Sequence, residues 1–232
     1  MNRVIAVDGP SGAGKSSVSR IVGRQLGFLH VDSGALYRIM TWQALRRGVD
    51  TSSPEAVARL AGEVVIECRP ENGAISFYVD GFRPENELRT PEINAHASKV
   101  AMVKEIRAAI TDLLRGMVKF GPLVVEGRDI TTAVFPDSPA RFFLTASPEA
   151  RARRRQKEEV EKGIASQSAE EVKKSLLARD EMDSTRKYAP LRKADGVLEI
   201  DSSELTLDEV VAAVLAALPA DWRKPKVFSA GI

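Results

Sequence analysis

Residues 9–16 read Gly9-Pro10-Ser11-Gly12-Ala13-Gly14-Lys15-Ser16, and they fit the pattern G-x-x-x-x-G-K-[S/T] at every fixed position. The apolar residues 4–7 just before them predict a buried parallel strand, and residues 17–22 just after them predict a helix. In such a strand, loop and helix unit the glycines adopt positive φ, so backbone N–H groups and the helix N-terminus can point at phosphate oxygens. The stretch therefore predicts a site for a nucleoside triphosphate.

The polar residues of this loop have separate expected tasks. Lys15 reaches the β- and γ-phosphates, and the hydroxyl of Ser16 ligates Mg²⁺. The remaining residues surround the phosphates with backbone groups. The residues expected to hold the triphosphate are Gly9, Pro10, Ser11, Gly12, Ala13, Gly14, Lys15, Ser16 and Ser17.

The composition is that of an ordinary globular protein, with 44% hydrophobic and 28% charged residues. A length of 232 residues suits one large domain or one domain with an insertion. The net charge of +2 is too small to indicate nucleic-acid binding, and an anionic small molecule suffices as the partner. We expect a monomer with no nucleic-acid or membrane partner.

Two features of the sequence predict a cytoplasmic protein. Cys68 is the only cysteine, which excludes an intrachain disulfide and fits a reducing compartment. The N-terminus enters the first strand without a charged leader and an apolar signal core, and no apolar stretch approaches about twenty residues. The two histidines, His30 and His96, lie in no motif for a base or a metal ligand, so we interpret both as structural.

Strand signals recur at long intervals with helical patterns between most of them, which is typical of a parallel sheet covered by helices. The expected strands are residues 4–7, 28–31, 123–125, 141–144 and 197–200. Helical periodicity is clear in residues 35–47, 103–118 and 207–218.

Three other segments interrupt this alternation. Residues 63–68 and 74–79 carry β-formers on either side of Pro70-Glu71-Asn72-Gly73, which predicts a small antiparallel insert. Residues 151–174 are rich in charge and carry more arginine than pairing along a helix needs, so we expect a mobile helical flap. Residues 221–232 lose periodicity and predict a loose tail.

The phosphate loop alone leaves GTPases, ATPases and small-molecule kinases open. A GTPase would carry an Asn-Lys-x-Asp tetrapeptide, and the sequence contains none. A remodelling ATPase would show an apolar strand that ends in Asp-Glu, whereas residues 123–125 lead into Glu126-Gly127-Arg128-Asp129. The arginine in this turn favours the binding of a second anion.

Three clusters combine hydroxyl, guanidinium and carboxylate groups. Ligands of open α/β sheets lie beyond the carboxyl ends of the strands, so the first two clusters should face the phosphate loop, and the third could close over them. A phosphate acceptor has a second pKa of about 6 and is already an anionic nucleophile at neutral pH, so it needs arginines more than a general base. The clusters are Asp32-Ser33-Gly34-Ala35-Leu36-Tyr37-Arg38, Gly127-Arg128-Asp129 and Arg179-Asp180-x-x-Asp183-x-x-Arg186.

With the phosphate loop and these clusters in order, the chain resembles the bacterial cytidylate kinases, a family of P-loop nucleoside monophosphate kinases, from the first strand to about Leu218. The resemblance implies transfer of the γ-phosphoryl group of ATP to CMP or dCMP, with ATP and Mg²⁺ bound. It also implies an α/β fold, a three-layer sandwich with a five-stranded parallel sheet, a small antiparallel insert in the monophosphate-binding part and a helical lid.

The implied organisation is one kinase domain over residues 1–218 and a C-terminal tail over residues 219–232. Within the domain, residues 1–62, 99–150 and 185–218 form the core. The monophosphate-binding insert is about residues 63–98, and the lid is about residues 151–184.

The resemblance also assigns roles to individual residues. Asp129 reads the base together with Ser98 and Arg107, since a carboxylate accepts a hydrogen bond from the amino group of cytosine and repels the carbonyl of uracil. Asp183 contacts the ribose, and Arg186 reaches the phosphates from the other side. The residues expected to bind the acceptor are Ser33, Tyr37, Arg38, Ser98, Arg107, Arg128, Asp129, Asp183 and Arg186.

The lid supplies three candidates for a clamp on the transition state, Arg151, Arg154 and Arg155, which share one face of a helix. The residues expected to take part in catalysis are Lys15, Arg128, Arg154 and Arg186.

Two other functions stay open at this point. The chain could be a phosphate-loop kinase for another small acceptor, such as UMP, AMP or shikimate. It could also be a regulator that binds ATP only as a switch, although the three acceptor clusters speak against this second alternative.

Overall fold

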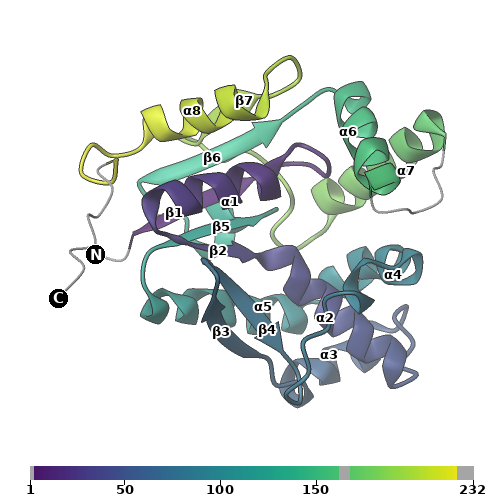
Figure 1. Ribbon diagram of the computed structural model, residues 1–232. Helices are drawn as coiled ribbons and strands as arrows, with labels where there is room; N and C mark the ends of the chain where they lie inside the picture. Colours follow the sequence, from purple (N-terminus) through teal and green to yellow (C-terminus); the bar gives the residue numbers. More distant parts are fainter. Residues whose placement is uncertain (1–2, 162–167, 224–232) are drawn as a thin grey trace.

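A single sheet forms the centre of the structure, a computed structural model that describes residues 3–161 and 168–223 (Figure 1). The order of its strands is β3-β4-β2-β5-β1-β6-β7. The five expected strands form a parallel core, as their apolar runs and long separations predict. These are β1 (Val4–Asp8), β2 (Leu29–Asp32), β5 (Leu123–Gly127), β6 (Ala140–Thr145) and β7 (Leu198–Asp201).

The sheet has seven strands and not the expected five, because the antiparallel insert joins it at the edge. Its strands β3 (Glu67–Glu71) and β4 (Ala74–Tyr78) form a hairpin whose turn is Asn72-Gly73, both with positive φ. Strand β4 pairs with β2 in parallel through His30 and Ala74. The apolar side chains of Ile75 and Phe77 are buried, so the hairpin both extends the core and covers the edge of β2.

Helices cover both faces of the sheet, which confirms the three-layer α/β architecture. On one face, α1 and α8 pack on a core that includes Ile5, Val7 and Phe142. On the other face, α2, α3 and α5 pack on a core that includes Val31 and Val125. The helices are α1 (Lys15–Leu26), α2 (Ser33–Arg46), α3 (Pro54–Glu63), α4 (Pro91–Ala101), α5 (Lys104–Gly116), α6 (Pro148–Glu161), α7 (Ala169–Thr185) and α8 (Leu207–Ala217), with single turns η1 (Glu87–Arg89), η2 (Met117–Phe120) and η3 (Ile130–Val134).

The expected charged flap consists of two helices, α6 and α7, which lie side by side at one end of the molecule (Figure 1). They share a small apolar cluster of Ala152, Val172 and Leu176. Helix α7 begins with a capping box, in which the side chains of Ser168 and Glu171 each bond a backbone N–H group. Part of the segment for which mobility was expected, residues 162–167, lies outside the described residues.

The expectation of a loose tail is wrong for its first residues. The side chain of Trp222 is 7% exposed, and its ring centroid lies 6.0 Å from that of Phe28. Asp221 accepts a hydrogen bond from Arg3 at 3.2 Å. Periodicity does not reveal a single aromatic anchor of this kind, and residues 224–232 lie outside the described part of the chain. None of the helices in residues 3–161 and 168–223 is long and apolar enough to span a membrane.

Candidate active site

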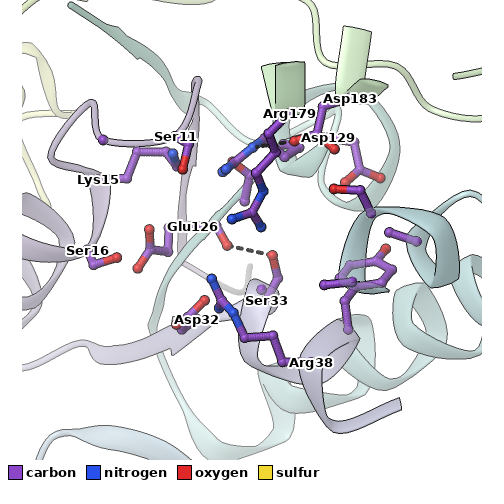
Figure 2. A pocket seen from close by; sticks show the side chains of 18 of the residues that line it. Ser11, Lys15, Ser16, Asp32, Ser33, Arg38, Glu126, Asp129, Arg179 and Asp183 are labelled. Carbon is purple, nitrogen blue, oxygen red and sulfur yellow. Dashed lines mark hydrogen bonds and ion pairs between the residues drawn. The ribbon is translucent and has the colours of Figure 1, made fainter. Parts of the chain in front are cut away.

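A cavity lies at the carboxyl ends of β1, β2 and β5, between the phosphate loop, the start of α2 and the lid helix α7 (Figure 2). Parallel strands bring their carboxyl ends to one edge, so loops that are far apart in the sequence meet there. The predicted residues that line the cavity are Ser11, Gly12, Gly14, Lys15, Ser16, Ser17, Ser33, Tyr37, Arg38, Ser98, Arg128, Asp129, Asp183 and Arg186.

The phosphate loop has the backbone conformation that its glycines predict. Gly9, Gly12 and Gly14 have φ angles of 148°, 78° and 87°. A Cβ atom on Gly9 would lie 1.9 Å from the carbonyl oxygen of Leu144, so no larger residue fits there. Helix α1 begins directly after Gly14, and its first N–H groups therefore face the cavity.

Lys15 is buried at the floor of the cavity, and its Nζ donates to the carbonyl oxygen of Pro10 at 2.7 Å. Burial, and next the positive charge of Arg128, lower the pKa of Lys15 to about 7. A polyphosphate beside the amine would favour its charged form. Such a ligand would therefore raise the pKa of Lys15 again.

Three arginines, Arg38, Arg128 and Arg179, line the cavity, and Figure 2 shows the guanidinium groups of Arg38 and Arg179 pointing into it. Burial, and then the charges of Arg128 and Arg38, lower the pKa of Arg179 to about 10. The buried Nε atoms of Arg38 and Arg179 have no hydrogen-bond partner within the described residues. Cations that repel each other and keep free donors need an anion, and the planar forks suit a phosphate group.

The far end of the cavity, toward α4 and α5, is built around Asp129. Its carboxylate accepts from Arg107 at 2.5 Å and lies 3.7 Å from Arg186. Arg107 also donates to the carbonyl oxygen of Ala101 at 2.9 Å, and its guanidinium lies over the ring of Tyr37. Arg107 therefore supports Asp129 from behind, while Ser98, Tyr37 and Asp129 itself line the cavity.

Asp183 lies on α7 between two arginines. It accepts from Arg128 at 3.0 Å and lies 3.6 Å from Arg186. The backbone N–H of Leu191 also donates to the carbonyl oxygen of Asp183, which fixes the end of the helix. Asp183 and Arg186 therefore hold α7 against the turn that carries Arg128 and Asp129.

The three candidate lid arginines have separate surroundings. Arg155 lines the cavity and pairs with Glu159 at 3.0 Å. Arg154, which was expected in catalysis, lies instead against Ser202 and donates to its Oγ at 2.9 Å and its carbonyl oxygen at 2.5 Å. Arg151 is buried against the phosphate loop. The three arginines share one helix face but contact three different parts of the structure, so their spacing along the sequence does not distinguish their roles.

Sequence reasoning assigned no role to three residues that shape the site. Arg179 belongs to the third cluster in the sequence, and the sequence patterns predict no separate role for it. Glu126 lines the cavity, and in Figure 2 its carboxylate points toward the hydroxyl of Ser16; its Oε1 lies 3.1 Å from Nε2 of His30. Asp8 is buried directly before the phosphate loop. For Asp8 and Glu126, the available signal in the sequence was a carboxylate at the end of an apolar strand.

Asp8 connects the phosphate loop to the turn that follows Asp129. It accepts hydrogen bonds from the backbone N–H groups of Ile130 and Thr131 at 2.8 Å and 2.7 Å, and from the Thr131 hydroxyl at 2.7 Å. Burial raises the pKa of Asp8 to about 6, against the effect of these hydrogen bonds. The side chain of Asp8 thus joins the phosphate loop to the turn that follows Asp129.

Comparison with known proteins agrees with this geometry. The sequence pattern of the family described as Cytidylate kinase matches residues 5–220. The cytidylate kinase of Streptomyces griseus is 43% identical over 214 residues, which cover 91% of this chain and 90% of that protein. The cytidylate kinase of Clostridioides difficile is 40% identical over 217 residues, which cover 94% and 98%.

Among solved structures, an uncharacterized protein from Eubacterium ventriosum superposes with a TM-score of 0.52. The match covers 93% of this chain and 97% of that one, at 12% identity. This likeness is one of fold alone.

Proposed function

This chain belongs to the cytidylate kinase family, and from that premise we propose how its cavity transfers the γ-phosphoryl group of ATP to CMP or dCMP, giving CDP or dCDP. The activity needs two anionic nucleotides to lie end to end. The phosphate loop and the arginine group of Arg38, Arg128 and Arg179 face the same cavity, and this is the observation that carries the proposal.

The donor ATP lies on the phosphate loop. Backbone N–H groups of the loop and of the first turn of α1 bind its phosphates, and the Lys15 amine neutralises the β- and γ-phosphates. Ser16 and Glu126 line the same side of the cavity, and an oxygen pair of this kind fits Mg²⁺ that keeps most of its waters and phosphate ligands. Mg²⁺, when bound, offsets negative charge on the phosphates.

The acceptor lies across the cavity. Arg38, Arg128 and Arg179 bind its phosphate, and their mutual repulsion falls when that anion arrives. Asp183 contacts the ribose in this proposal, and Arg186 reaches the phosphates from the other side. Asp129 accepts from the amino group of cytosine, with Ser98 beside it and Arg107 holding the carboxylate in place.

The chemistry requires alignment and charge neutralisation more than proton transfer. The acceptor phosphate is an anionic nucleophile at neutral pH, so no side chain has to remove a proton from it. The arginines and Lys15 offset the charge that spreads over the transferred group, and the lid helices exclude water. Arg155 is the lid arginine placed to assist, whereas Arg154 would have to leave Ser202 first.

We also propose that the enzyme works as a cytoplasmic monomer on small-molecule nucleotides. A single free cysteine, Cys68, suits a reducing compartment.

The direct test is an assay of the purified chain with MgATP and a panel of nucleoside monophosphates, followed by identification of each diphosphate. We expect CDP and dCDP as the main products and much slower formation of UDP. The matched variant Arg38→Ala should lose activity through a higher KM for CMP. If AMP is consumed faster than CMP, or if ATP binds without any transfer, the proposed function is wrong.

A further inference from the structure

The two lid helices meet the tip of the phosphate loop at Ser11. The Oδ1 atom of Asp180, on α7, accepts a hydrogen bond from the backbone N–H of Ser11 at 3.1 Å. Arg151, on α6, donates to the carbonyl oxygen of Ser11 at 3.1 Å. Arg151 and Asp180 also bond to each other, so both backbone groups of Ser11 are held by one ion pair.

This contact is largely closed to water. The side chains of Arg151 and Asp180 are 6% and 16% exposed. The Nε of Arg151 donates to the carbonyl oxygen of Ala146, which fixes the guanidinium from behind. Gly12 lies directly against Arg151, since a Cβ atom on it would be 3.1 Å from the Arg151 Cβ. Arg151 and Asp180 therefore form a buried, specific contact between the two helices and the phosphate loop.

Helix α7 carries acceptor-side groups next to this joint. Arg179, the residue before Asp180, faces the cavity, and Asp183 and Arg186 follow one and two turns later. A helix is stiff over such a short distance. The position of α7 on the phosphate loop therefore sets where these three side chains stand in the acceptor half of the cavity.

We propose that Asp180, together with Arg151, is a positioning residue that couples donor binding to acceptor binding. This inference rests on the proposed function. ATP orders the phosphate loop through its N–H groups, and the ordered loop holds Asp180 and hence α7 in place. Arg179 and its neighbours on α7 are then set for CMP before it arrives. By reciprocity, CMP must strengthen ATP binding by the same factor.

The experiment is isothermal titration calorimetry of CMP into the full chain, alone and saturated with Mg²⁺ and the non-hydrolysable analogue AMP-PNP. For the wild type we expect CMP to bind about tenfold more tightly when the analogue is present, within the usual range of coupling between sites. In Asp180→Ala the ratio should fall to nearly one, while the affinity for CMP alone stays close to that of the wild type. Titration of AMP-PNP into the full chain, alone and saturated with CMP, should give the same affinity ratio in the wild type and the same loss of that ratio in Asp180→Ala.

Glu181→Ala is the matched control. Glu181 is the next residue on α7, is exposed, and carries the same charge, so its removal should leave the ratio unchanged. Because Asp180→Ala leaves Arg151 buried without its counter-charge, Asp180→Asn is the second variant if the first does not fold. It keeps an acceptor for Ser11 and should lose at least half of the wild-type ratio.

Two results overturn the inference. One is a wild-type affinity for CMP that does not depend on AMP-PNP, and the other is an Asp180 variant that keeps the wild-type ratio. A wild type that binds no CMP under either condition is a different result, because it contradicts the proposed function itself.

Discussion

Lys15 and Asp129 stand on opposite sides of the cavity in Figure 2, and each carries a charge suited to a different nucleotide. Lys15 lies on the phosphate loop, where we propose that it binds the phosphate oxygens of ATP. Asp129 is held by Arg107 and Arg186, and in the proposed function it accepts a hydrogen bond from the base. Each can be changed without removing the other.

Asp129→Asn should weaken the preference for CMP over UMP. The amide replaces a pure acceptor with a group that can also donate to the uracil carbonyl, so the ratio of kcat/KM for CMP to that for UMP should fall by about tenfold to a hundredfold. Competition between the two substrates in one reaction measures this ratio. Asp137→Asn, on the exposed surface away from this cavity, is the control. Discrimination that stays at the wild-type level would exclude Asp129 as the reader of the base.

Lys15 should take up a proton when ATP binds. Its pKa of about 7 in the free protein means that at about pH 8 most molecules carry a neutral amine, and nearby phosphates restore the charge. Calorimetry in buffers of different ionisation enthalpy should therefore show uptake of nearly one proton at about pH 8 and less at about pH 6. Lys15→Arg stays charged and should remove this uptake. Equal uptake by the variant and the wild type would refute the assignment.

At the level of residues, the sequence predicts the chemistry of a side chain better than it predicts which other side chains it contacts. The motifs and the family resemblance singled out Lys15, Arg38 and Asp129, and all three line the cavity, whereas their individual roles stay predictions. Helical spacing placed Arg154 and Arg155 on one face, yet one contacts Ser202 and the other the cavity. Which partner a side chain meets depends on tertiary packing, and a pattern along one chain does not contain that information.

At the level of elements, helices α6 and α7 present charged side chains to the cavity. Arg179 and Asp183 on helix α7, and Arg186 directly after it, line the cavity, and under the proposed function they contact the bound nucleotides. We expect backbone amides of α6 and α7 to exchange more slowly with deuterium when AMP-PNP and CMP are both bound than with either alone.

Helix α3 provides the internal reference for this exchange experiment, since none of its residues lines the cavity. Its exchange should not change on binding. If α6 and α7 behave like α3, they form a fixed extension of the domain and not a lid.

The insert shows how far element prediction reaches. The β-formers and the Asn72-Gly73 turn correctly predict a hairpin. They do not predict that the hairpin continues the main sheet, because that depends on the bridge between His30 and Ala74 and on the burial of Ile75 and Phe77. Long-range pairing of this kind follows from an exposed sheet edge, which exists only once the other strands have assembled.

At the level of the whole molecule, Trp222 ties the end of the described chain to the core. Trp222→Ala should lower the free energy of unfolding by about 3 kcal/mol, because a large buried ring against Phe28 is replaced by a cavity. Trp222→Phe should recover most of this loss. Urea unfolding curves provide the measurement, and a Trp222→Ala variant within about 1 kcal/mol of the wild type would show that this packing does not matter.

The overall architecture followed from the sequence because buried parallel strands and amphipathic helices carry strong, regular patterns. The division into core, insert and lid stays a prediction. What links these parts is the cavity, into which the donor loop, the acceptor arginines and the base reader all face.

The central claim is that ATP and CMP lie end to end in this cavity. A crystal structure with AMP-PNP, Mg²⁺ and CMP tests it most directly. We predict the AMP-PNP phosphates on the loop at Lys15, the CMP phosphate between Arg38, Arg128 and Arg179, and the cytosine amino group facing Asp129. Ordered CMP bound away from these arginines, with AMP-PNP still on the loop, would contradict the account.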